Sequence, residues 1–282
     1  MYPSDFEYVA PKTVQEAVSI LQQNPDAKLL AGGHSLLPMV KIRLLSPPML
    51  VDIGRIAELR GVRQNGGTTI GAMTTYADLA ASNELRSSLP VLVECAAKVG
   101  DPAVRNRGTI GGSLAHADPA ADMPAVILAL GATMKLAGPD GERSVAADDF
   151  FVGMLESAVQ PGEVLTEIEV PAMPAKMGSA YEKFKHPASG YAVVGVAVMV
   201  HQGEDGAVSD CRIAVTGAGP KAQRATAAED ALKGGASAAD AAAKAADGLE
   251  LSGDVYAGEE YRAQLARVLT KRALERALEQ IR

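Results

Sequence analysis

The chain has 282 residues, of which 48% are hydrophobic and 22% charged, so it is long enough for two domains with sizeable cores. Its formal net charge of −7 argues against nucleic-acid binding, because a protein that follows phosphates needs a dense basic face. No apolar run approaches the roughly 20 residues that cross a bilayer, and the N-terminus lacks the parts of a signal peptide. We therefore expect a cytoplasmic protein with no transmembrane segment.

The two cysteines, Cys95 and Cys211, each lie in an apolar stretch. An iron–sulfur cluster normally takes four cysteine ligands, and a structural zinc ion takes four closely spaced Cys or His residues. The sequence therefore predicts no metal site, and any redox role needs an organic cofactor. A disulfide between the two cysteines is an alternative, although two buried reduced thiols fit their apolar surroundings better.

The first segment, about residues 1–55, alternates between helix and strand. Thr13 is placed to cap a helix that runs through Leu21. Short buried strands are predicted at 27–31 and 49–53, and the first runs directly into the glycine pair Gly32–Gly33.

The second segment, about residues 56–175, contains both helices and strands. Strands are predicted at 59–63, 68–70, 133–137 and 164–170, and helices from Thr75, at 90–99 and at 123–130. The stretch 101–122 is rich in Gly, Pro, Asp and Asn, and we expect it to be a loop.

The third segment, residues 176–282, follows a linker rich in proline and methionine. Three strands at 181–185, 192–201 and 208–215 are joined by short turns, which indicates an antiparallel meander. The chain is then Ala-rich and helical to its end. The sequence thus predicts an α+β fold, with a two-part α/β domain over 1–175 and a C-terminal domain over 176–282 of antiparallel strands and helices.

A candidate anion site lies at Ala31 to Ser35, with the sequence AGGHS. A buried strand that ends in paired glycines lets backbone N–H groups converge, and such a nest binds anionic oxygens. His34 and Ser35 add side-chain donors. On this stretch alone, an ordinary strand-to-helix turn is the more common interpretation.

A second loop, Thr109 to Ser113 with the sequence TIGGS, repeats the same chemistry. Two such loops favour a clamp on a diphosphate, because one loop rarely satisfies two negative groups. The dinucleotide fingerprint GxGxxG and the P-loop pattern are both missing. Downstream, Asp118 or Asp122 is placed to accept from a ribose hydroxyl or an adenine amine, and helix capping by Asp122 is the structural alternative.

The two glycine motifs occur within longer stretches that resemble a known family. The stretches AGGHSLLPMVKIRL and RNRGTIGGSLAHADPAAD, followed by EVLTEIEVP and YEKFKHPASGYA, resemble the FAD-binding medium subunit of carbon monoxide dehydrogenase-type molybdenum hydroxylases. This group is the flavoprotein part of the xanthine dehydrogenase family. The resemblance covers essentially the whole chain.

The resemblance implies a set of cofactor-binding residues. The first loop would contact the FAD diphosphate and ribityl chain, the second would close over the diphosphate, and Asp122 would bind the adenosine end. Leu165 would lie near the adenine, Lys185 would reach the flavin region, and Tyr191 would lie beside the isoalloxazine ring. Val99 falls where some relatives carry a stacking aromatic residue. The full implied set is Leu30, Ala31, Gly32, Gly33, His34, Ser35, Leu36, Leu37, Thr109, Ile110, Gly111, Gly112, Ser113, Asp122, Leu165, Lys185 and Tyr191.

By resemblance, the chain is an electron relay with no catalytic residue of its own. It would take electrons from a small subunit with two-iron two-sulfur clusters, which are fed by a large molybdopterin subunit, and pass them to an external acceptor. The assembly would be a dimer of heterotrimers, and the large subunit would choose the substrate. A stand-alone FAD-dependent oxidoreductase and a non-redox nucleotide- or CoA-binding module are the alternatives.

Overall fold

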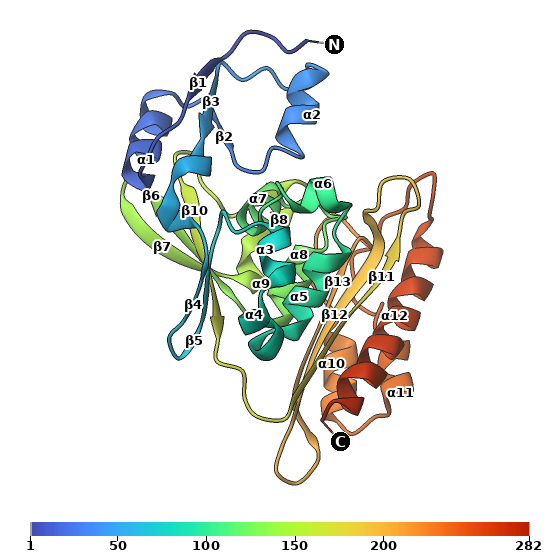
Figure 1. Cartoon of the computed structure of the whole chain (residues 1–282). Helices are drawn as coiled ribbons and strands as arrows, with labels where there is room; N and C mark the ends of the chain where they lie inside the picture. The colour runs from blue at the N-terminus through green and yellow to red at the C-terminus, as the bar shows by residue number, and fades with distance from the viewer. Residues whose placement is uncertain (1, 282) are drawn as a thin grey trace.

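A computed structural model describes residues 2–281 of the chain. Figure 1 shows a small N-terminal unit, coloured blue, at one end of a larger body. In that body, helices α3 (Tyr76–Ala81), α5 (Pro90–Lys98) and α8 (Met123–Ala129) lie between a five-stranded and a four-stranded sheet. Helix α12 (Glu259–Glu279) covers the other face of the four-stranded sheet. The mixture of helices and sheets confirms the predicted α+β class.

The N-terminal unit is built on a parallel sheet. Its strand order is β1 (Glu7–Val9), β3 (Met49–Asp52), β2 (Lys28–Leu30). Helix α1 (Val14–Gln23) begins where the Thr13 hydroxyl accepts the N–H of Glu16 at 3.1 Å. The capped helix and both strands of this segment are confirmed. Helix α2 (Leu36–Lys41), which the sequence left unassigned, follows the first glycine loop directly.

The five-stranded sheet is antiparallel throughout. Its order is β4 (Val62–Gln64), β5 (Gly67–Gly71), β10 (Val164–Pro171), β6 (Thr133–Gly138), β7 (Gly141–Ala146). Leu59, predicted to begin a strand, lies instead in the second of two short 3-10 helices, η1 (Ile53–Arg55) and η2 (Ala57–Leu59). There its side chain is 1% exposed, so it packs in the core of the N-terminal unit.

Helices that the sequence did not predict lie within the stretch expected to be a loop. That prediction was wrong for α6 (Pro102–Arg105) and α7 (Ile110–His116). Helix α7 forms despite two glycines because the Thr109 hydroxyl accepts the N–H of Gly112 and because Ile110 and Leu114 are fully buried. The remaining elements of the segment from residue 56 to residue 175 are α4 (Asn83–Ser88), α9 (Ala147–Phe150), β8 (Phe151–Gly153) and β9 (Glu156–Ser157).

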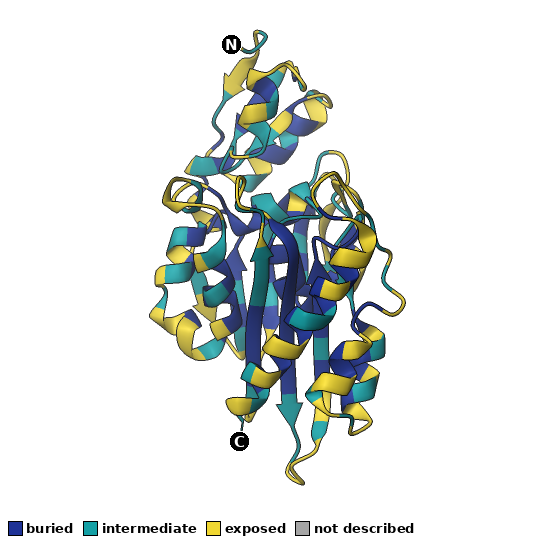
Figure 2. Ribbon diagram, turned by 90° about the vertical axis from the view of Figure 1, so that its right-hand side faces the viewer, coloured by how far each residue is buried: buried dark blue, intermediate teal, exposed yellow. Residues whose placement is uncertain are grey.

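The four-stranded sheet contains the predicted meander and one further short strand. Its order is β11 (Met177–Lys185), β12 (Ala192–Gln202), β13 (Val208–Thr216), β14 (Gln223–Arg224). Helices α10 (Thr226–Lys233) and α11 (Ala238–Ala243) precede α12. Nine consecutive residues of β12, from Ala192 to Val200, are buried because both faces of the sheet carry helices. Figure 2 shows this buried strand at the centre of the molecule.

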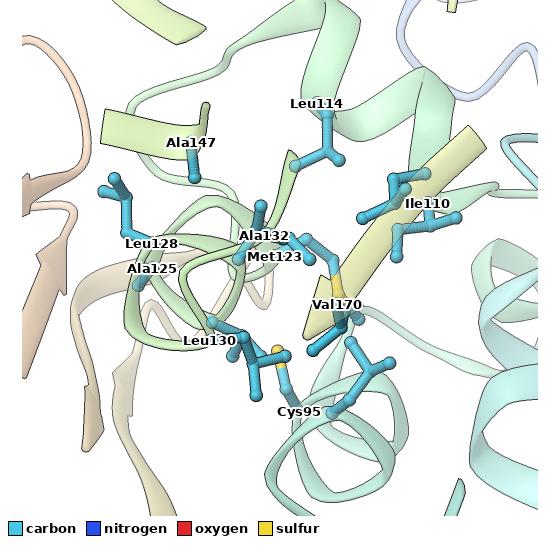
Figure 3. Close-up of a cluster of buried hydrophobic side chains, with 14 of the residues drawn as sticks. Cys95, Ile110, Leu114, Met123, Ala125, Leu128, Leu130, Ala132, Ala147 and Val170 are labelled. Atoms are coloured by element: carbon cyan, nitrogen blue, oxygen red, sulfur yellow. The ribbon is translucent and has the colours of Figure 1, made fainter. Parts of the chain in front are cut away.

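Buried side chains of the middle helices form one large cluster with the neighbouring sheets. Figure 3 shows Cys95 of α5 among Met123, Leu130 and Val170. Tyr181 and Met199 of the four-stranded sheet belong to the same cluster. Both Cys95 and Cys211 are buried free thiols, as expected. The division of the chain near residue 175 stays a prediction.

Candidate cofactor site

A cavity of about 710 Å³ lies where the N-terminal unit, helix α7 and the loop after β11 meet. This volume falls in the range of small-molecule and cofactor sites. The two glycine loops, which are far apart in sequence, lie against each other at the cavity. A Cβ added to Gly32 would stand 2.8 Å from the Cα of Gly108, the residue just before the second loop, so this close approach requires glycine at position 32.

The first loop presents free backbone donors. Gly33 has a φ of +79°, which turns the chain from β2 into α2. Among residues 2–281, no acceptor within the chain is found for the N–H groups of Gly33, His34 and Ser35. These residues line the cavity, so their N–H groups are available to a bound anionic group.

The second loop contributes differently. The N–H of Gly111 donates to Ala72 at 2.8 Å, and the N–H of Gly112 donates to the Thr109 hydroxyl at 3.1 Å. The amides of these two glycines are therefore already engaged within the chain, and the loop adds hydroxyl groups and close packing to the cavity. A Cβ on Gly111 would lie 2.9 Å from the Cα of Ala72, so this glycine is required by the fold itself.

Asp122 is the buried acidic group of the cavity wall. The Tyr181 hydroxyl donates to its Oδ1 at 2.5 Å, and the Lys183 ammonium donates to its Oδ2 at 2.9 Å. Burial raises the pKa of the Asp122 carboxyl, and the charge of Lys183 is the largest effect that opposes the rise. The carboxylate makes no capping hydrogen bond to α8, so the capping alternative is wrong.

The segment before Asp122 is held by the C-terminal part of the chain. The N–H of Ala192 donates to the carbonyl of Ala120 at 3.1 Å. The Thr216 hydroxyl lies 2.8 Å from the carbonyl of Pro119 and 2.7 Å from that of Ala121. Backbone and side-chain donors of β12 and β13 therefore fix the position of Asp122 relative to the glycine loops.

Most of the residues implied by the resemblance line this one cavity. Those at the cavity are Ala31, Gly32, Gly33, His34, Ser35, Leu36, Thr109, Gly111, Gly112, Ser113, Asp122, Leu165 and Tyr191. Leu30 and Leu37 flank the first loop outside the lining, and Ile110 is fully buried in the core. Lys185 is exposed at the end of β11, outside the lining.

Tyr191 lies at the mouth of the cavity and is 41% exposed. The pKa of its phenol is raised, chiefly by partial burial and then by the charge of Asp118. Val99, where the resemblance placed an aromatic residue in some relatives, also lines the cavity. The ring and the valine thus give the opening an apolar character.

Two side chains of the site were missed by sequence reasoning, Tyr181 and Lys183. Both lie on β11, and both contact Asp122, which comes from a distant part of the chain. Their spacing of two along a strand places them on one face with Lys185. The sequence shows that these side chains share one face of the strand, but it does not show that Asp122 lies against that face.

No group of three His, Cys, Asp or Glu side chains in residues 2–281 is arranged to hold a metal ion. Within the same range, no helix combines the length and apolar character needed to span a membrane. The cytoplasmic location stays a prediction.

Comparison with known proteins assigns both halves of the chain to domain families. Residues 4–173 match the FAD binding domain in molybdopterin dehydrogenase. Residues 179–277 match the CO dehydrogenase flavoprotein C-terminal domain.

Relatives match over almost the full chain. The carbon monoxide dehydrogenase medium chain of Hydrogenophaga pseudoflava is 45% identical over 98% of both chains. Subunit alpha of the 6-hydroxypseudooxynicotine dehydrogenase complex of Paenarthrobacter nicotinovorans is 39% identical, over 100% of this chain and 97% of the relative. A solved structure of the Hydrogenophaga pseudoflava carbon monoxide dehydrogenase superimposes with a TM-score of 0.95 at 46% identity, covering 100% of both chains. Quinoline 2-oxidoreductase from Pseudomonas putida 86 gives a TM-score of 0.92 at 37% identity, over 99% of both chains.

Proposed function

We propose that this chain, which belongs to the family of FAD-binding flavoprotein subunits of molybdopterin-dependent dehydrogenases, relays electrons within a molybdenum hydroxylase complex. Its cofactor is FAD, and the complex is an oxidoreductase. Electrons arrive from iron–sulfur clusters of a partner subunit and leave to an external acceptor. The flavin supplies the electron chemistry, and the protein supplies binding and orientation.

The observation that carries this proposal is the cavity between the two glycine loops. Gly33, His34 and Ser35 line it, and their N–H groups, which have no acceptor within residues 2–281, suit the oxygens of a diphosphate. Apolar side chains such as Leu165 and Val99 line other parts of the wall and suit flat ring systems.

The residues that would hold FAD are assigned accordingly. Residues 30–37 and 109–113 surround the diphosphate and ribityl chain, and Asp122 accepts a hydrogen bond from the adenosine end. Leu165 packs near the adenine and Tyr191 beside the isoalloxazine ring. Lys185 needs to turn inward from its exposed position to reach the flavin region.

The names of the relatives support a multi-subunit assembly, because they include a medium chain and a subunit of a dehydrogenase complex. We infer that a large molybdopterin subunit and a small subunit with two-iron two-sulfur clusters are the partners. A dimer of these heterotrimers fits the general preference of oligomers for two-fold symmetry.

Reconstitution tests the relay. The chain is mixed with the partner chains that co-purify with it, substrate is added, and the bleaching of the flavin absorbance is followed. We expect rapid flavin reduction with all three chains and none when the small iron–sulfur subunit is left out. Oxidation of the substrate by the lone chain at the full rate of the complex would contradict the relay and favour a stand-alone flavoenzyme.

A further inference from the structure

Asp122 and Lys183 form a buried ion pair at the cavity wall. Both side chains are 4% exposed, and the ammonium nitrogen lies 2.9 Å from Oδ2. Asp122 lines the cavity, whereas Lys183 stands behind it. The Lys183 ammonium also donates to the carbonyl of Lys98 at 3.3 Å, so helix α5 fixes it from the other side.

The pair leaves the carboxylate with unused capacity. Each carboxylate oxygen has about two lone-pair sites, and each oxygen of Asp122 accepts a single hydrogen bond from β11. The carboxylate can therefore accept a further hydrogen bond on the side that faces the cavity.

We propose that Lys183 is a positioning residue of the cofactor site, which holds Asp122 ionised and aimed into the cavity so that it accepts a hydrogen bond from FAD. This inference rests on the proposed function, because it takes FAD as the occupant. The donor is an N–H or O–H group of the cofactor. A buried lysine on the C-terminal sheet thereby becomes part of a site whose glycine loops belong to the N-terminal half.

The proposal predicts a pH dependence with a definite sign. Burial raises the pKa of Asp122, and Lys183 opposes this rise more than Tyr181 or Lys98 does. Without Lys183 the pKa rises further, so the carboxylate becomes protonated at a higher pH and can no longer act purely as an acceptor. The titratable groups that face Asp122 or its neighbours are Tyr181 and Lys183 of β11, Glu94, Cys95 and Lys98 of α5, Tyr76 of α3, Tyr191, and Asp118 beside Tyr191.

The test measures FAD affinity between about pH 6 and 9 for the full chain, with any partner chains that co-purify, in Lys183→Met and Asp122→Asn variants. We expect Lys183→Met to bind FAD about tenfold more weakly at neutral pH, which is about 1.4 kcal/mol, and to recover toward the wild-type affinity as the pH rises. Lys183→Arg should restore most of the affinity. Asp122→Asn should weaken binding at every pH, and adding Lys183→Met to it should weaken binding no further.

A matched control removes a different ion pair, which is partly buried and lies outside the lining of the cavity. Arg224 pairs with Glu229, which is 1% exposed, within the C-terminal sheet and helices. Arg224→Met should lower the thermal midpoint yet leave FAD affinity unchanged at each pH. Should Lys183→Met fail to fold, Lys183→Gln tests the same loss of charge. The wild-type chain gives a second test, because its FAD affinity should fall at acid pH and Asp122→Asn should abolish that fall.

Wild-type FAD affinity in Lys183→Met across the pH range would overturn the proposal. So would a loss of affinity that pH does not reverse while Asp122→Asn binds normally. In both cases the wild-type chain still binds FAD, so the proposed function stands. A wild-type chain that takes up no FAD would overturn the proposed function and this inference together.

Discussion

At Gly33 the backbone geometry bears most directly on the proposed cofactor binding. Its φ of +79° is strained for any side chain with a Cβ, and an added Cβ would lie 2.9 Å from the Leu37 side chain. In Gly33→Val the loop has to shift, and the N–H groups of His34 and Ser35 shift with it. We predict a loss of FAD affinity of about tenfold or more, measured by equilibrium titration of the deflavinated protein.

Gly66 provides a matched control for this substitution. It has a comparable φ of +68°, in the turn between β4 and β5, and an added Cβ there meets no heavy atom of the described chain within 4 Å. Gly66→Val should therefore carry similar backbone strain and leave FAD affinity unchanged. Equal losses of affinity in the two variants would show that the first loop acts only through stability.

Sequence reasoning could propose site residues that a short motif marks, such as the glycine pair. It missed residues that reach the site only through tertiary contacts, such as Lys183. A glycine pair after a buried strand can be recognised in the sequence alone, because glycine allows backbone conformations that other residues rarely adopt. Lys183 is different, since only the packing of β11 against the segment before α8 places it beside Asp122. Lys185 has the same residue type and nearly the same position, yet it is exposed.

At the scale of elements, the contact between β13 and the segment before α8 fixes the position of Asp122 in the cavity wall. Thr216 is fully buried, and its hydroxyl lies within hydrogen-bond distance of the carbonyls of Pro119 and Ala121, to which it can donate its one proton. Thr216→Val keeps the shape and removes that hydroxyl. We predict a destabilisation of about 1 to 3 kcal/mol, seen as a lower thermal midpoint, together with weaker FAD binding.

Thr270 in α12 is a control for Thr216, because it is also a buried threonine but its hydroxyl has no hydrogen-bond partner in the described part of the chain. Thr270→Val should therefore leave the thermal midpoint unchanged or raise it, because an unsatisfied polar group is removed. An equal drop in both valine variants would mean that the hydroxyl of Thr216 contributes nothing specific.

Some of the elements that sequence reasoning missed lack a local hydrophobic pattern. Strand β7 is mostly exposed at the sheet edge and lacks an apolar alternation, so only its pairing with β6 identifies it. Helix α7 contains two glycines, which disfavour a helix locally, and the packing of Gly111 against Ala72 overrides that preference. By contrast, the capped helices α1 and α3 and the buried strands of the meander were predicted because their signals are local and repeated.

At the scale of the whole molecule, the cofactor site belongs to neither half of the chain alone. The glycine loops come from residues 31–35 and 109–113, while Tyr181, Lys183 and Tyr191 come from the C-terminal sheet and the loop that follows β11. The large core cluster also takes side chains from both halves. The cavity and the core cluster thus draw on both matched domains, over 4–173 and 179–277.

The identity of the released flavin tests the central claim most directly. The purified chain, or its complex, is denatured, and the supernatant is separated by chromatography against FAD and FMN standards. The account predicts FAD at one molecule per chain, because the cavity is lined both by the loop proposed to hold the diphosphate and by Asp122, proposed to accept a hydrogen bond from the adenosine end. Release of FMN, or no flavin after reconstitution with excess FAD, would contradict it.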